Sequence, residues 1–331
     1  MTLLEVENLT VEFPTEDGVI TAVRGVSYTL NPGEALGIVG ESGSGKSVTS
    51  LAVLGLLPRS ARVTGSVRFN GKELLGRSDD ELSEYRGNRI AMIFQDPLAS
   101  LNPVYTVGNQ IGEAVLAHHD VGKAAARRRA LELLEIVGIP NAKQRLDSYP
   151  HEMSGGMKQR VVIAIAMANN PDVIIADEPT TALDVTVQAQ VLEALETARE
   201  ATGAALVLIT HDLGVIAGHA DRLCVMYAGR LVETGTVDDV FYRPRMPYTL
   251  GLLGSLPRID ALTHSRLTPI TGAPPSLLSL PSGCPFRARC PLAAEICAAE
   301  EPALYGVGQG HGAACHFHER LIDAQPEEIF Q

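Results

Sequence analysis

Residues 40–47 read GESGSGKS. It matches the pattern G-x-x-x-x-G-K-S/T, in which backbone N–H groups surround phosphate oxygens. Gly43 and Gly45 allow successive amides to turn toward the phosphates. Lys46 can reach the β- and γ-phosphates, and the Ser47 hydroxyl can ligate Mg²⁺. The stretch therefore predicts a nucleotide phosphate-binding loop.

The sequence on either side of this loop argues against two other interpretations of the glycine-rich stretch. The apolar run ALGIVG (35–40) indicates a buried strand before the loop, and SVTSLAVLGLL indicates a helix after it that runs to Pro58. A glycine-rich turn that binds nothing would not need this strand–loop–helix context. A dinucleotide-binding G-x-G-x-x-G loop fails, because no third glycine follows at the required step.

The rest of the chain predicts an α/β fold. Apolar and polar residues alternate over the first thirty positions, which indicates short antiparallel strands. Helical patterns fill 97–148, where Ala130, Leu133, Leu134 and Val137 share one face. DVIIAD (172–177), ALVLIT (205–210) and the strand-like 222–235 alternate with helices. Such alternation predicts a mostly parallel sheet.

Composition narrows the class of function. The chain has 331 residues, 45% of them hydrophobic, and a formal net charge of −12. This balance argues against nucleic acid as a partner, and the basic run at 123–129 is expected to be a solvated helix face. The N-terminus lacks the pattern of a signal peptide, and no apolar run is long enough to span a bilayer. We expect a cytoplasmic chain.

A second chemical motif is the acidic pair in DVIIADEP (172–179). At the end of a strand, Asp177 can hold Mg²⁺, and Glu178 can polarise the water that attacks the γ-phosphorus. An acidic pair in this place could instead cap a helix. The phosphate loop favours the catalytic interpretation.

MSGGM (153–157) places a glycine pair at the start of a basic helix. Ser154 can cap that helix, and the freed amides could bind a further phosphate. Taken alone this signal is weak, because Ser-Gly-Gly is common in loops.

The order of motifs resembles the ATP-binding subunits of ABC transporters over residues 1–240. The phosphate loop is followed by FQDP (94–97), SGG, DEPTTALD (177–184) and LITHD (208–212). The resemblance implies a P-loop ATPase core with a helical subdomain at about 97–160. Met153 and Met157 depart from the family's LSGGQ, so any contact of the glutamine amide is lost.

The resemblance also assigns roles to residues. Gln95 would sense Mg²⁺ and the transmembrane partner, His211 would hold the γ-phosphate, and Glu178 would be the catalytic base. The SGG residues would bind ATP held by an opposite subunit, Asp184 would lie at the seam between subunits, and Phe13 would stack on adenine. The implied Mg²⁺ site is Ser47, Gln95 and Asp177. The ATP-binding set is Phe13, Ser42, Gly43, Ser44, Gly45, Lys46, Ser47, Val48, Ser154, Gly155, Gly156, Met157 and Asp184.

Proline-rich sequence beyond residue 243 resembles the C-terminal extension of oligopeptide and dipeptide importer ATPases, which sets a domain boundary at 240/241. The loop GESGSGKSVTS is most similar to their D-type subunit. This resemblance implies two permease subunits, an F-type companion or a second copy of the chain, indirect contact with an extracytoplasmic peptide-binding protein, and a place on the cytoplasmic face of the membrane. Nickel or glutathione importers, soluble ABC ATPases and phosphate-loop kinases are the alternatives.

Four of the five cysteines lie in this extension, spaced C-x₅-C-x₆-C-x₁₇-C: Cys284, Cys290, Cys297 and Cys315. Four thiolates suit a 4Fe-4S cluster or Zn²⁺, although zinc ligands usually come in close C-x₂₋₄-C pairs. Peptide-importer ATPases that the chain resembles carry an iron–sulfur cluster at matching cysteines, which favours iron. Unligated or disulfide-bonded cysteines remain the alternative. Three histidines near Cys315 are either substitute ligands or surface residues: His311, His316 and His318. We expect such a metal to have a structural role and to stabilise the fold of the extension.

Overall fold

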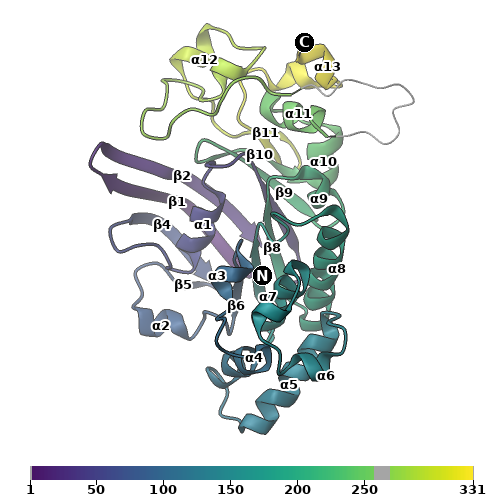
Figure 1. Ribbon diagram of the computed structural model, residues 1–331. Coiled ribbons are helices and arrows are strands. Elements are labelled where there is room, and N and C mark those ends of the chain that lie inside the picture. The colour runs from purple at the N-terminus through teal and green to yellow at the C-terminus, as the bar shows by residue number, and fades with distance from the viewer. Residues whose placement is uncertain (1, 257–268, 331) are drawn as a thin grey trace. The chain divides into compact units, whose positions relative to one another are not determined.

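The computed structural model describes residues 2–256 and 269–330 (Figure 1). The chain divides into two compact units, each built from several stretches of sequence. The first contains Met1–Leu3, Leu30–Ala35 and Gly76–Ile209, and the second contains Leu4–Thr29, Leu36–Leu75 and Thr210–Gln331. Part of the predicted C-terminal extension, 257–268, lies outside the described residues. The predicted boundary at 240/241 stays a prediction.

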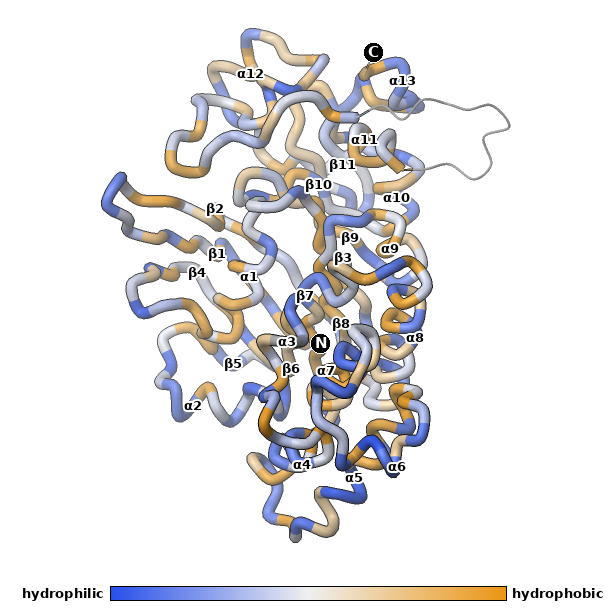
Figure 2. The backbone as a smooth tube through the Cα atoms, in the orientation of Figure 1, coloured by the Kyte–Doolittle hydropathy of each residue, from blue (hydrophilic) through white to orange (hydrophobic). Residues whose placement is uncertain are grey.

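An antiparallel sheet forms the N-terminal part of the second unit. Its strands are β1 (Leu4–Thr15), β2 (Gly18–Leu30), β4 (Arg62–Phe69) and β5 (Lys72–Glu73), in the order β2-β1-β4-β5. Hydrophobic and hydrophilic residues alternate along β1 (Figure 2). Leu4, Val6 and Val11 are buried as a result, which confirms the predicted antiparallel strands.

The phosphate loop follows a strand of a second sheet in this unit. Strand β3 (Ala35–Val39) is buried throughout and pairs in parallel with β9 (Arg222–Tyr227). Strands β10 (Arg230–Thr236), β12 (His311–Ala313) and β11 (Tyr305–Gly308) continue the sheet in antiparallel fashion, in the order β11-β12-β10-β9-β3. The sequence did not predict β11 and β12.

Helix α1 (Lys46–Val53) starts inside the phosphate loop. It ends before the predicted limit at Pro58, because the chain turns at Gly55, whose φ of 62° is left-handed. The first turn of α1 nevertheless holds the residues that the motif requires, so the early end leaves the loop intact.

The first unit contains a parallel sheet with helices. Its strands β6 (Ile90–Ile93), β7 (Val173–Asp177) and β8 (Ala205–Thr210) run parallel, in the order β8-β7-β6. Helix α8 (Val185–Thr202) follows β7 and buries Val191, Leu195 and Ala198. Helix α7 (Gly155–Ala166) packs against α8. The alternation of strands and helices confirms the predicted α/β class.

A group of helices fills 97–152 of the first unit (Figure 1). It comprises α3 (Pro97–Ser100), α4 (Val107–Leu116), α5 (Lys123–Ile136), α6 (Ala142–Arg145) and a 3₁₀ turn at Pro150–Glu152, and the short α2 (Asp79–Ser83) precedes it. The predicted apolar face, including Leu133 and Leu134, is buried. The basic run lies on α5, where Arg127 forms an ion pair with Asp147.

The C-terminal part of the second unit has short helices around an aromatic cluster. The helices are α9 (Leu213–Ala217), α10 (Val237–Tyr242), α11 (Pro247–Gly254), α12 (Glu295–Ala299) and α13 (Pro326–Ile329), with 3₁₀ turns at Arg287–Arg289 and His318–Leu321. Phe286 packs against Tyr227 and Tyr248, with ring centroids 5.3 and 5.4 Å away. In the described residues, no helix is long and apolar enough to cross a bilayer.

Candidate nucleotide-binding site

The conformation of the phosphate loop depends on its glycines. Gly43 and Gly45 have φ values of 78° and 99°, which residues with side chains rarely adopt, and Gly45 is the residue directly before α1. A Cβ on Gly40 would lie 2.2 Å from the Met226 carbonyl oxygen, and one on Gly45 would lie 2.5 Å from the Ala22 oxygen. The glycines are therefore required by close backbone approach as well as by conformation.

The side chain of Lys46 forms hydrogen bonds with the backbone of this loop. Its side chain is almost buried, with 4% exposed, and Nζ donates hydrogen bonds to the carbonyl oxygens of Gly40 at 2.8 Å and Glu41 at 3.1 Å. An ammonium group placed over the loop is suited to contact phosphate oxygens. Ser42 is exposed, Ser44 is buried, and Ser47 and Val48 are half-buried in the first turn of α1.

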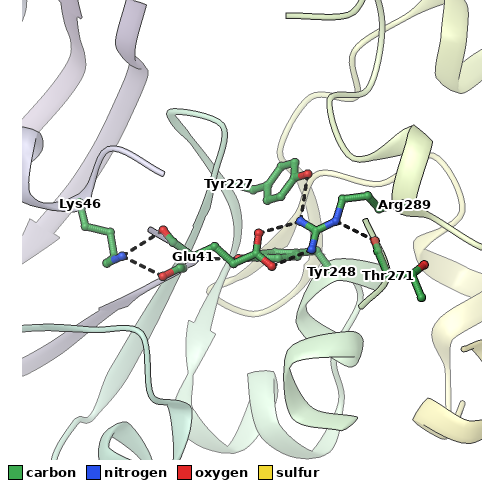
Figure 3. Close-up of polar contacts among 7 residues, drawn as sticks. Glu41, Lys46, Tyr227, Tyr248, Thr271 and Arg289 are labelled. Atoms are coloured by element: carbon green, nitrogen blue, oxygen red, sulfur yellow. Dashed lines mark hydrogen bonds and ion pairs between the residues drawn. The ribbon is translucent and has the colours of Figure 1, made fainter. Parts of the chain in front are cut away.

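Glu41, within the loop, is a feature that the sequence did not single out. Its carboxylate forms a bidentate ion pair with Arg289, at 2.6 and 2.8 Å (Figure 3). Its backbone N–H donates to the Tyr248 hydroxyl at 2.9 Å. The Glu41 carboxylate raises the pKa of the Arg289 guanidinium further above its ordinary value. The phosphate loop is thus bonded to the C-terminal part of its own unit.

The acidic pair lies at the end of β7 in the first unit. Asp177 is 5% exposed. Glu178 has a φ of 47°, a left-handed conformation that costs energy for a residue with a side chain. Its Oε2 accepts hydrogen bonds from Gln95 Nε2 at 3.0 Å and from Thr181 Oγ1 at 2.8 Å. Gln95 and Glu178, which the sequence assigned to one site, are therefore in direct contact.

Ser154 and Asp184 both cap helices of the first unit. Ser154 Oγ accepts from the Met157 N–H at 3.3 Å at the start of α7, and Asp184 Oδ1 accepts from the Val187 N–H at 3.0 Å at the start of α8. A Cβ on Gly156 would lie 2.3 Å from Val187 Cγ1, so this glycine permits the two helices to pack closely. Ser154 and Gly155 are exposed, so these groups face solvent.

The two remaining predicted residues lie in the second unit. His211 is exposed and precedes Asp212, whose Oδ1 caps α9 by accepting from the Gly214 N–H at 2.8 Å. Phe13 is half-buried on β1 and is not part of the buried core. Both side chains thus keep exposed surface, as contact with a ligand would require.

The four clustered cysteines form no disulfide bond. Burial raises the pKa of the Cys290 thiol to about 12 and that of Cys315 to about 11, and the charges of Cys284 and Cys297 add to both shifts. Backbone N–H groups donate to sulfur, as that of Phe317 does to Cys315 Sγ at 3.3 Å. Within 2–256 and 269–330, no three His, Cys, Asp or Glu side chains are grouped to hold a metal ion. The predicted 4Fe-4S cluster and its zinc alternative are therefore not supported by this arrangement.

His311 is not a surface residue. It is 5% exposed, and its Nε2 lies 2.9 Å from Oε1 of Glu233, which is fully buried. Glu233 also accepts from the backbone N–H groups of Arg245 and Met246. His311 thus serves as the partner of a buried carboxylate on β10. His316 and His318 are half-buried.

Comparison with protein families gives two matches along the chain. The family described as ABC transporter matches residues 23–181. The family described as oligopeptide/dipeptide transporter, C-terminal region, matches residues 232–297. The first match contains the phosphate loop and the acidic pair, and the second contains Arg289 and three of the clustered cysteines.

Two relatives with similar names match this chain over nearly its whole length. The oligopeptide transport ATP-binding protein OppD of Mycobacterium tuberculosis is 56% identical over 99% of this chain, which covers 54% of that protein. The chain therefore spans about half the length of this relative. The dipeptide transport ATP-binding protein DppD of Bacillus subtilis is 52% identical over 97% of this chain and 96% of its own length.

Two solved structures share the fold. The dimeric post-hydrolysis structure of the ATP-binding cassette MJ0796 with ADP and Pi has a TM-score of 0.63 and 28% identity, over 71% of this chain and 99% of that one. The structure of cbiO1 from Clostridium perfringens, part of the ABC transporter complex cbiONQ, has a TM-score of 0.61 and 28% identity. The match covers 73% of this chain and 91% of cbiO1. The chain belongs to the family of oligopeptide and dipeptide transport ATP-binding proteins of ABC transporters.

Proposed function

We propose that the chain is the D-type ATP-hydrolysing subunit of an ABC importer for dipeptides or oligopeptides. The observation that carries the proposal is the phosphate loop held by Lys46, whose Nζ lies 2.8 Å from the Gly40 oxygen. The names of the relatives, which are transport ATP-binding proteins for such peptides, support the substrate class. Nickel or glutathione importers remain the alternative, since selectivity would lie in other subunits.

In the proposed reaction Glu178 acts as general base. Its carboxylate accepts a proton from water, the water oxygen attacks the γ-phosphorus, and the bond to the β-phosphate oxygen breaks to leave ADP and phosphate. Gln95 and Thr181 donate to Oε2, which fixes the orientation of the carboxylate. The fixed position matters, because a base must lie within hydrogen-bond reach of its proton.

Further residues would complete the site. Asp177, Gln95 and Ser47 would hold Mg²⁺, His211 would contact the γ-phosphate, and Phe13 would stack on adenine. The exposed start of α7, with Ser154 and Gly155, and the cap Asp184 would serve the nucleotide of a second ATPase subunit. That subunit is an F-type companion or a second copy of this chain. The dimeric form of MJ0796, a structural neighbour, supports a two-cassette arrangement.

Two permease subunits are the proposed membrane partners, with the extracytoplasmic binding protein contacted only through them. A cavity of about 740 Å³ opens on the helical part of the first unit, between α4 and α5. Exposed apolar groups lie close by in sequence, among them Phe94, Val104 and Tyr105. Tyr105 lines this hollow, and an exposed aromatic side chain beside a hollow is suited to contact a helix from another chain. This arrangement favours a peripheral position at the membrane over a soluble ABC ATPase or a kinase.

We also propose the finer assignment of a 4Fe-4S cluster to Cys284, Cys290, Cys297 and Cys315. Its grounds are the spacing of the four cysteines and the resemblance to peptide-importer ATPases that carry such a cluster, since the arrangement of the described side chains does not itself support it. Such a cluster takes one thiolate at each iron, so its ligands need not converge as they do on one zinc ion. When bound, the cluster would staple the extension.

The experiment that tests the proposed function is Mg²⁺-ATP titration of the purified chain and of Lys46→Ala. Removal of the ammonium group should weaken ATP binding by at least tenfold, since charge-assisted hydrogen bonds contribute about 1.5–3 kcal/mol. An unchanged affinity would contradict the assignment. Co-purification with permease subunits of the importer class then separates the transporter from a soluble ATPase.

A further inference from the structure

The phosphate loop is bonded to a residue that lies 248 positions further along the chain. Arg289, in the 3₁₀ turn Arg287–Arg289, donates from Nη1 and Nη2 to the two carboxylate oxygens of Glu41 (Figure 3). The side chain of Arg289 is 6% exposed and that of Glu41 is 26% exposed. Parallel bonds of this kind fix direction as well as distance.

The guanidinium group is itself held on several sides. Its Nε donates to the Thr271 carbonyl oxygen at 3.1 Å, and Nη1 lies 3.4 Å from the Tyr227 hydroxyl. The rings of Tyr227 and Phe286 each lie 5.9 Å from its central carbon. A group so constrained can transmit its position to Glu41, whereas a flexible surface arginine could not.

Glu41 connects this clamp to Lys46. Its carbonyl oxygen accepts from Lys46 Nζ at 3.1 Å, and its N–H donates to Tyr248 at 2.9 Å. The side chain and the N–H of Glu41 are therefore hydrogen-bonded to the C-terminal part of the unit, and its carbonyl oxygen is hydrogen-bonded to Lys46. Movement of Arg289 or Tyr248 would move the peptide that holds the lysine.

The charge of Glu41 has a second consequence. A carboxylate inside a loop that receives a triphosphate repels the ligand, and in partly buried surroundings this repulsion is weakly screened. Arg289 neutralises that carboxylate. The extension thus removes an electrostatic obstacle that the loop sequence itself introduces.

We propose that Arg289 is a positioning residue for the phosphate loop: by pairing with Glu41, the C-terminal extension sets the geometry and charge of the ATP site. The proposal rests on the proposed function, because it concerns the same nucleotide. It assigns the extension a part in ATP binding, in addition to any metal-stapled structure of its own.

The test uses the full chain and the fluorescent nucleotide mant-ATP with Mg²⁺. Arg289→Met removes the charge while retaining bulk, and should weaken binding about tenfold, within the range of about 5- to 150-fold typical of coupled sites. Adding Glu41→Gln to it should restore affinity to within about threefold, because the uncompensated negative charge is gone. A purely structural loss would not be rescued in this way.

Glu301→Gln is the matched control. Glu301 pairs with Arg24 at 2.7 Å and with Arg230 at 3.0 Å, so its loss breaks two ion pairs of the extension, neither of which includes a residue of the phosphate loop. This variant should bind nucleotide as the wild type does. Equal loss in Glu301→Gln and Arg289→Met would overturn the proposal, because general loosening would then explain both.

Two further outcomes complete the test. If Arg289→Met does not fold, Arg289→Lys decides, since lysine keeps the charge but cannot form the two-pronged contact. A loss of at least threefold in folded Arg289→Lys supports the clamp, and wild-type affinity overturns it. A wild-type chain that binds no mant-ATP contradicts the proposed function instead, so the two failures are distinguishable.

Discussion

The buried carboxylate of Glu233 on β10 lies 2.9 Å from Nε2 of His311. His311→Ala removes a side-chain partner of a fully buried carboxylate. A buried carboxylate that is charged and loses the partner opposite it costs about 3–5 kcal/mol. The backbone N–H groups of Arg245 and Met246 still donate to Glu233, so we expect the lower end, about 3 kcal/mol.

Hydrogen exchange measures this cost locally. β12 pairs with β10 through Glu233 and Ala313, so the backbone amides of β12 report opening of the pair. A cost of about 3 kcal/mol corresponds to a loss of about 10²-fold in amide protection at pH 8. Protection within threefold of the wild type would contradict this prediction, because it would show that Glu233 does not need His311.

The pH dependence has a definite sign. Burial raises the pKa of Glu233 above its ordinary value, and His311 opposes that rise. A carboxyl group with a raised folded-state pKa destabilises the fold at high pH, and the cost disappears as pH falls through that pKa. In His311→Ala, adding Glu233→Gln should therefore restore more protection at pH 8 than near pH 5. Equal restoration at both values would contradict the assignment.

Three further variants test the remaining parts of the account. Gly156→Ala places a methyl group 2.3 Å from Val187 Cγ1 and should lower the free energy of unfolding by about 1–3 kcal/mol. Gly155→Ala, whose new methyl group has its nearest neighbour at 3.5 Å, should melt near the wild-type temperature. Equal melting temperatures of the two variants would contradict this packing. Ser154→Arg should retain ATP binding by the isolated subunit yet block ATP-driven dimerisation in gel filtration, and an unimpaired dimer would argue against its role. Anaerobically purified protein should contain iron and absorb near 400 nm (about the usual cluster band), and Cys290→Ser should abolish both; stoichiometric zinc in a colourless preparation, or no metal at all, would overturn the cluster.

The phosphate loop could be predicted because its chemistry is local. Its glycines, Lys46 and Ser47 lie within eight residues, and the flanking strand and helix have their own hydrophobic periods. The Gln95–Glu178 contact joins residues 83 positions apart, and only the family resemblance brought them into one site. Local pattern alone would have left Gln95 as a surface residue.

The C-terminal part shows why the rest could not be predicted. Strand β12 reads His-Gly-Ala, which has no intrinsic preference for a strand and forms one by pairing with β10. Arg289 belongs to no motif and Glu41 occupies an unspecified position of the loop motif, so nothing local predicts their ion pair, which lies beside the packed rings of Phe286 and Tyr248. Tertiary contacts of this kind leave no periodic signal in sequence.

The most direct test of the central claim is steady-state ATP hydrolysis by the assembled transporter with Glu178→Gln. The amide retains the shape of the carboxylate beside Gln95 and Thr181 but cannot accept the proton of the attacking water. Loss of a general base should lower the rate by about 10²–10⁴-fold while ATP still binds. A variant that hydrolyses ATP at more than about half the wild-type rate would contradict the assignment of Glu178 and, with it, the proposed mechanism.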